Sequence, residues 1–166
     1  MPLQELMLAE NDTTGLWHRA VLEGERRAGI SLGPMLEEHL TMTLRSYLKD
    51  TELCAVVARE FLETYALYDS EALIRVAGRC LLIAGFFPEL SRRRNVRIGY
   101  FFEMGVGAYR AHAGYWQARR RTSYAKASRS AAERFADLVK TLRGMKNSEL
   151  LAEELQATKI SPLEWH

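Results

Sequence analysis

The 166-residue sequence has little cysteine and little proline, and it lacks the signals of secretion and membrane insertion. Its two cysteines, Cys54 and Cys80, are too few for the disulfide framework of a small secreted protein. The first residues lack the basic and apolar regions of a signal peptide. The longest apolar run, from Cys80 to Pro88, is too short to span a bilayer. These absences predict a cytoplasmic protein with reduced thiols and no membrane partner.

No long stretch alternates apolar and polar residues with period two, so the sequence predicts no β-sheet. Apolar residues recur instead at helical spacing. We predict one all-α domain over residues 1–160, a bundle of six to eight helices, with a tail over residues 161–166. A chain of this length can bury a core without disulfides or a metal.

Helix boundaries are predicted from capping residues and from glycine and proline. The first helix is expected to end near Gly29, and Pro88 is expected to bend or end a later one. The residues expected to begin helices are Thr13-Thr14, Gly33-Pro34, Asp50-Thr51, Asp69-Ser70, the capping box from Ser130 to Glu133, and Ser148.

The segment from Gly99 to Trp116 carries two apolar stripes at helical spacing. Two stripes indicate burial on more than one side, so we predict a buried central helix near residues 98–116. Glycine costs about 1 kcal/mol relative to alanine inside a helix. Gly105 therefore indicates a close packing contact or a ligand.

Charge is distributed unevenly although the net charge is only +2. Residues 1–89 contain 8 basic and 14 acidic residues, residues 90–146 contain 14 and 3, and residues 147–166 contain 1 and 4. This asymmetry favours docking of one half on the other, within a chain or a dimer, and leaves open an anionic partner.

Two arginine clusters are the candidate anion-binding residues. They flank the predicted central helix and comprise Arg92, Arg93, Arg94, Arg119, Arg120 and Arg121. Arginines beside aromatic residues such as Tyr115 and Trp116 can hold phosphates and stack on bases. No nucleic-acid-reading motif accompanies them, so nucleic acid is an alternative partner rather than the favoured one.

Motifs for known chemistries are missing or lack their structural context. Gly29 to Gly33 matches the nucleophile elbow Gly-x-Ser-x-Gly, but no strand is predicted before it, which favours a turn between helices with glycine as its left-handed cap. None of the histidines completes a Glu-x-x-His pair, and the sequence has no Cys-x-x-Cys or P-loop. We predict no metal site and no catalytic residue.

Four residues are weak candidates for a cofactor or small-molecule site. Glu103 interrupts an aromatic run, and Tyr109 and His112 lie on one face of the predicted central helix. His18 lies in the first helix. A helical haem pocket can be built around a single histidine, but the favoured interpretation is a core histidine, or a structural ion pair of Glu103 with Arg79 or with one of Arg92 to Arg94. No cofactor is predicted.

Residues 70–115 resemble a group of small, all-helical bacterial proteins. The matching positions are Arg79, Gly85, Phe86, Phe87, Pro88, Asn95, Tyr100, Gly105 and Tyr109. The group has no assigned activity, so the resemblance implies a bacterial, cytoplasmic origin and no site residue.

Taken together, these features predict a non-catalytic interaction or regulatory module that associates as a homodimer or with another protein. The sequence leaves two alternatives. One is a polyanion-binding module that uses the basic region 92–146. The other is a helical haem-binding or small-molecule-binding protein, or an enzyme, with a pocket near Glu103, Tyr109 and His112.

Overall fold

The computed structural model describes residues 3–47, 69–93 and 96–146 of the chain. These residues form seven helices and no strand, which confirms the predicted all-α fold. The helices are α1 (Leu3–Ala28), α2 (Pro34–Tyr47), α4 (Ser70–Phe86), α5 (Glu89–Arg93), α6 (Ile98–Ala118), α7 (Thr122–Glu133) and α8 (Phe135–Lys146). The helices expected after Asp50-Thr51 and Ser148, and the tail 161–166, lie outside the described residues.

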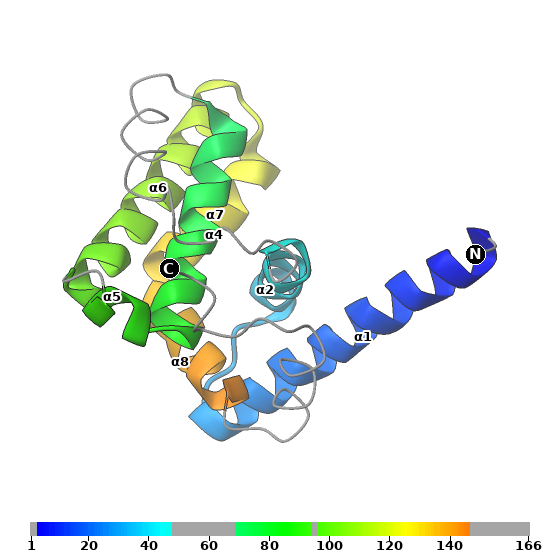
Figure 1. Ribbon diagram of the computed structural model, residues 1–166. Coiled ribbons are helices and arrows are strands. Elements are labelled where there is room, and N and C mark those ends of the chain that lie inside the picture. The colour runs from blue at the N-terminus through cyan, green and yellow to red at the C-terminus, as the bar shows by residue number, and fades with distance from the viewer. Residues whose placement is uncertain (1–2, 48–68, 94–95, 147–166) are drawn as a thin grey trace.

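Helix α4 is the most completely buried helix, with 13 of its 17 residues in the core. Asp69 caps it as predicted, because its Oδ1 accepts hydrogen bonds from the Glu71 and Ala72 amides at 3.1 and 3.4 Å. The helix ends at Phe86, before Pro88. Helices α6 and α8 pack against it, and α2 contacts it (Figure 1). A helix that is apolar all round is expected in such a position.

Helix α6 matches the predicted helix near residues 98–116, but most of its burial lies on one side. Its buried residues face α4 and α7 and comprise Phe101, Met104, Gly105, Ala108, Tyr109 and Ala113. A Cβ atom added at Gly105 would lie 2.6 Å from ring atoms of Phe135, so packing against α8 explains this glycine. Both predicted stripes become partly exposed towards the end of the helix, since Tyr115 on one and Trp116 on the other are half-buried.

Helices α1 and α8 cross at two glycines. A Cβ atom added at Gly144 would lie 2.6 Å from the carbonyl oxygen of Gly24, so the two backbones touch directly. Beyond this crossing, the first part of α1 extends away from the other helices (Figure 1).

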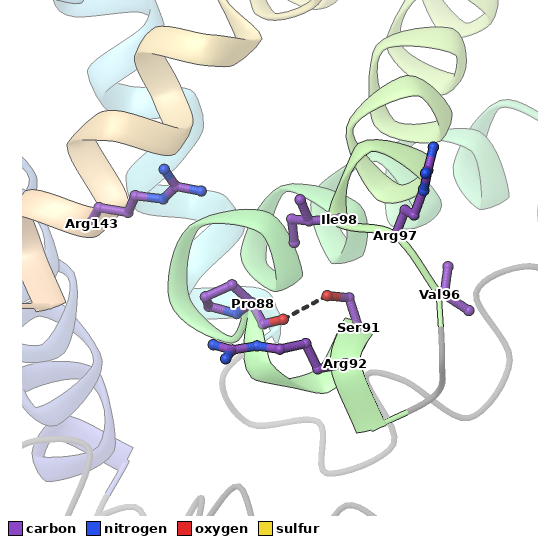
Figure 2. A pocket seen from close by; sticks show the side chains of 7 residues that line it. All are labelled: Pro88, Ser91, Arg92, Val96, Arg97, Ile98 and Arg143. Carbon is purple, nitrogen blue, oxygen red and sulfur yellow. Dashed lines mark hydrogen bonds between the residues drawn. The ribbon is translucent and has the colours of Figure 1, made fainter.

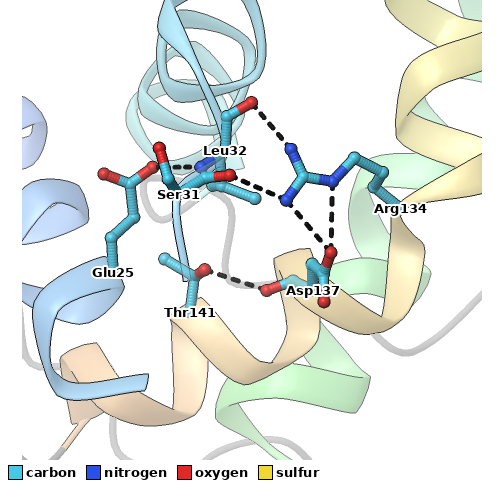
Figure 3. A network of polar contacts seen from close by, with 6 residues as sticks. All are labelled: Glu25, Ser31, Leu32, Arg134, Asp137 and Thr141. Carbon is cyan, nitrogen blue, oxygen red and sulfur yellow. Dashed lines mark hydrogen bonds and ion pairs between the residues drawn. The ribbon is translucent and has the colours of Figure 1, made fainter. Parts of the chain in front are cut away.

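A five-residue turn joins α1 to α2. Gly29 and Gly33 have φ angles of +68° and +84°, which only glycine adopts readily, and Pro34 begins α2 as predicted. Ser31 is exposed in this turn, so the interpretation of the Gly-x-Ser-x-Gly match as a turn between helices is confirmed. Arg134 donates hydrogen bonds to the carbonyl oxygens of Ser31 and Leu32, as Figure 3 shows.

Two predicted helix starts are wrong. Thr13 and Thr14 lie inside α1, which begins at Leu3; interior threonines cost only a fraction of a kcal/mol each, so their capping preference is easily overridden. Ser130 lies inside α7, and the break falls at Arg134 instead. There, contacts with the distant α1–α2 turn compete with the local capping signal.

None of the described helices has a stretch of sufficient length and apolarity to cross a membrane.

Candidate functional site

The two arginine clusters lie at opposite ends of α6. Arg92 and Arg93 belong to α5, shortly before α6, and Arg119 to Arg121 follow its last turn. A 21-residue helix is about 30 Å long, so the clusters form two separate surfaces rather than one. Arg94 and the side chain of Arg93 lie outside the described residues.

The described contacts of the arginine cluster after α6 mainly cap the C-terminus of that helix. The Arg119 guanidinium lies 3.5 Å from the centre of the Tyr115 ring and donates to the Tyr115 carbonyl oxygen at 3.1 Å. Arg120 has a φ angle of +57°, and the Arg121 amide donates to the Trp116 carbonyl oxygen. These contacts satisfy carbonyl groups that a helix C-terminus leaves without partners. All three side chains remain exposed.

Arg92, in the cluster before α6, borders a cavity of about 510 Å³, which is within the size range of small-molecule sites. Its lining comes from residues 88–92, from residues 96–98 and from α8, and comprises Pro88, Ser91, Arg92, Val96, Arg97, Ile98 and Arg143 (Figure 2). Arg143 reaches from α8 towards Pro88, and Arg92 folds back below the same residue. Arg97 stands on the opposite rim, directly before α6.

Backbone and side-chain hydrogen bonds fix the floor of this cavity. The Ser91 hydroxyl donates to the Pro88 carbonyl oxygen at 2.6 Å, and the Val96 amide donates to the Ser91 carbonyl oxygen at 2.8 Å. Lys146 donates to the Phe86 carbonyl oxygen at 2.7 Å and lies 3.7 Å from the Glu89 carboxylate. The end of α4 is therefore tied to α8, and the segment 88–96 is folded on itself.

The electrostatic character of the cavity is positive. Three arginines line it, and among the described residues its lining contains no carboxylate. It also lies at the N-terminus of α6, where Arg97 occupies the capping position without a side-chain hydrogen bond to the helix. A helix N-terminus carries a partial positive charge, so it adds to the field of the arginines. This combination suits an anion.

A second polar cluster lies inside the bundle, between α2, α6 and α7. The Nε2 atom of His39 and the Tyr109 hydroxyl are 2.7 Å apart, and Tyr109 is fully buried. Nearby, His112 Nδ1 lies 2.6 Å from the Ser128 hydroxyl oxygen. The Trp116 indole N–H donates to His112 Nε2 at 3.2 Å. The sequence candidates Tyr109 and His112 thus belong to two neighbouring, partly buried groups, the first of which also includes His39.

The hydrogen bonds of His112 define its protonation. An indole N–H can only donate, so His112 Nε2 must accept and carries no proton. The remaining proton is on Nδ1 and is donated to Ser128. Burial lowers the pKa of His112, and burial together with the neighbouring His112 lowers the pKa of His39 to about 4. Both imidazoles are neutral at physiological pH.

The pocket expected near Glu103, Tyr109 and His112 is not assembled. Glu103 is solvent-exposed, and nine helical positions place it about 180° from His112 around α6. Because it is exposed, Glu103 needs no buried partner such as Arg79. His18 is also exposed on α1.

The histidine environments also bear on haem and metal binding. Both ring nitrogens of His112 are engaged, so it could ligate iron only by losing a hydrogen bond. Within residues 3–47, 69–93 and 96–146, no three His, Cys, Asp or Glu side chains are grouped for a metal ion.

Three residues of the arginine-lined cavity and of the histidine cluster were not among the candidates named from the sequence. Arg97 and Arg143 stand in the basic region, but nothing in the local pattern separates them from the other exposed basic residues. His39 lies 70 positions from Tyr109, and only the packing of α2 brings it to α6.

Searches of protein-family models, of curated proteins and of solved structures each returned no match to this chain.

Proposed function

We propose that this chain is a non-catalytic binding module that takes an anionic group between Arg92 and Arg143, with Arg97 on the opposite rim. The observation that carries the proposal is that Arg92 of α5 and Arg143 of α8 lie on either side of Pro88 in one cavity, which Arg97 also lines, and that none of the described residues lining it is a carboxylate. Arginine presents several donors in a planar fork, which matches carboxylate and phosphate oxygens.

Binding rather than catalysis is favoured by the chemistry of the lining. Among the residues that the structure describes, the lining side chains include no histidine, carboxylate or cysteine and so supply no group that titrates near neutral pH for general acid–base work. The Ser91 hydroxyl is already donated to the Pro88 carbonyl oxygen, and the described part of the lining holds no histidine or carboxylate that could activate it.

A small anion fits better than a long polyanion. The second arginine cluster lies about 30 Å away at the other end of α6, and Arg119 in that cluster is stacked on Tyr115. Nucleic acid binding would need many phosphates neutralised along a continuous surface.

The test is a titration of the full chain with inorganic phosphate and with acetate, followed by two-dimensional NMR of the backbone amides. We expect shifts at Ser91, Val96 and Ile98 that weaken with added salt. Arg92→Gln should weaken binding about 10-fold, as expected for the loss of one charge-assisted hydrogen bond, whereas Arg110→Gln, an exposed arginine on α6, should leave it unchanged.

Two outcomes would overturn this proposal. One is the absence of shifts at the cavity. The other is an oligonucleotide that binds with equal strength to the wild type and to Arg92→Gln.

Self-association is a second candidate function. Leu22 on α1 and Met42 on α2 are large apolar side chains that are 41% and 44% exposed. Exposed apolar groups of this size are common at interfaces between copies of a chain. A native mass spectrum should then contain a dimer whose fraction falls in Leu22→Ser; a monomer at all concentrations would exclude it.

A further inference from the structure

A second cavity adjoins the arginine-lined one. It has a volume of about 190 Å³ and shares Ile98 and Arg143 with its neighbour. The shared residues place the two cavities on either side of one narrow wall. A ligand bound between Arg92 and Arg143 would therefore need only to pass Ile98 to reach the second space.

The second cavity is largely apolar. Its lining comprises Ala84, Ile98, Gly99, Phe102, Ala136, Val139, Lys140 and Arg143. The Phe102 ring is fixed edge-on against Phe135, with centroids 4.7 Å apart, so this wall is preformed. Lys140 can line the cavity with its aliphatic stem while its charged end stays in water, and the Arg143 guanidinium lies 3.5 Å from the Ala84 carbonyl oxygen, to which it donates. An apolar group placed here would lose contact with water at no cost in buried charge.

Ile98 is a further sign of an apolar occupant. It is an isoleucine at the first position of α6 and is 36% exposed, although it lines both cavities. Covering it would remove apolar surface from water, which favours binding roughly in proportion to the area covered.

We infer that the ligand is an anionic amphiphile, a small molecule with its carboxylate or phosphate between Arg92 and Arg143 and an apolar chain over Ile98 in the second cavity. The inference rests on the proposed anion site. A ligand with only one of these two properties would use only part of the surface. A simple anion leaves the apolar cavity open, and an uncharged apolar molecule leaves the arginines without a partner. The volume of the second cavity limits the apolar part to a short chain.

The experiment is a calorimetric titration of the full chain with straight-chain carboxylates from acetate to decanoate, kept below the concentrations at which they aggregate. Each added methylene should tighten binding about 4-fold until the second cavity is full, after which longer chains should gain nothing. Octanol, which has the chain without the charge, should bind at least 10-fold more weakly than octanoate.

Two variants separate the halves of the site. Ala136→Gln places a polar side chain at an exposed position of the second cavity and should flatten the dependence on chain length, while phosphate binding stays as in the wild type. Ala118→Gln, at an exposed position at the other end of α6, is the matched control and should change neither. Arg92→Gln should weaken all carboxylates by the same factor.

The titrations distinguish a failure of the anion site from a failure of the amphiphile inference. Phosphate and acetate that do not bind would remove the anion site and this inference with it. Phosphate that binds, together with carboxylates whose affinity does not depend on chain length, would overturn the amphiphile alone. Octanol that binds as tightly as octanoate would also overturn it, since the arginines would then contribute nothing.

Discussion

Arg134 lies 103 positions after Ser31, yet its guanidinium donates to the Ser31 carbonyl oxygen at 2.8 Å. The same group donates to the Leu32 carbonyl oxygen at 3.0 Å and bonds to the Asp137 carboxylate (Figure 3). The Leu32 amide is held in turn by Glu25 at 2.8 Å. This network joins the α1–α2 turn to the break between α7 and α8, so it fixes how the first two helices sit on the rest of the bundle.

We expect Arg134→Met to lower the free energy of unfolding by about 2 kcal/mol. The variant keeps the aliphatic stem but leaves two carbonyl groups without their charged donor, and a hydrogen bond from a charged group contributes about 1.5–3 kcal/mol. Arg134→Lys should give a smaller loss, because one ammonium cannot reach both carbonyls in a fork. Urea unfolding followed by far-UV circular dichroism measures the difference, with Arg110→Met as the exposed control; equal stability of Arg134→Met and the control would contradict the role of the network.

Replacing glycine by alanine should have opposite effects on stability at Gly144, where α8 crosses α1, and at Gly114, inside α6. Gly144→Ala should destabilise the fold by about 1–3 kcal/mol, because the new Cβ would lie 2.6 Å from the Gly24 carbonyl oxygen and the helices must separate. Gly114→Ala should stabilise it by up to about 1 kcal/mol, since Gly114 lies inside α6 with open space around it. Thermal unfolding of the two variants and of the wild type measures both effects. A stabilised Gly144→Ala would show that α1 and α8 do not touch at Gly144.

The free energy of unfolding should fall with acidification through His39, which is partly buried between the helices. Its pKa is about 4 in the folded chain and about 6.5 when unfolded, so between these values the unfolded chain binds more protons. The difference in the pKa of His39 contributes up to about 3 kcal/mol to the free energy of unfolding. This contribution is complete above pH 6.5, decreases as the pH falls, and is lost by about pH 4. His39→Gln cannot take up this proton and still offers Tyr109 a hydrogen-bonding partner. Urea unfolding between pH 4 and 7 should therefore give a shallower pH dependence for the variant; parallel curves would show that His39 does not titrate in this way.

Local sequence was sufficient for most of the fold. Asp69 and Pro34 begin their helices as predicted, since each supplies the capping hydrogen bond or the backbone angle that its position needs. The break at Arg134 could not be found in this way. Ser130 offered a plausible helix start, but the residue that marks the actual break bonds to a turn 103 positions earlier.

The candidate site was predicted in part, for a similar reason. Arg92 was identified from its cluster, whereas Arg143 belongs to the cavity only because α8 packs beside the end of α4. Tyr109 and His112 stood out because they are polar groups on an apolar face. His39 lies in another helix, and no local spacing could pair it with Tyr109.

The hydrogen bond from Trp116 to His112 should respond to pH in a defined direction. Because the indole N–H donates to Nε2, protonation of His112 at that atom removes the acceptor and ends the bond. The indole N–H resonance of Trp116, assigned by its loss in Trp116→Phe, should therefore shift and exchange faster with solvent as the pH falls. Burial lowers the pKa of His112, so the midpoint should lie below 6.5.

Ser128→Ala tests the other side of the same ring. Without the hydroxyl, the proton on Nδ1 loses its acceptor, so the tautomer that lets Nε2 accept from Trp116 is favoured less. The Trp116 resonance should then move at neutral pH, before any acid titration, whereas Trp17→Phe should leave it in place. A Trp116 resonance that is constant from pH 7 to 4 in the wild type would mean that the indole does not donate to His112. A midpoint at or above 6.5 would mean that the ring is not desolvated between α6 and α7.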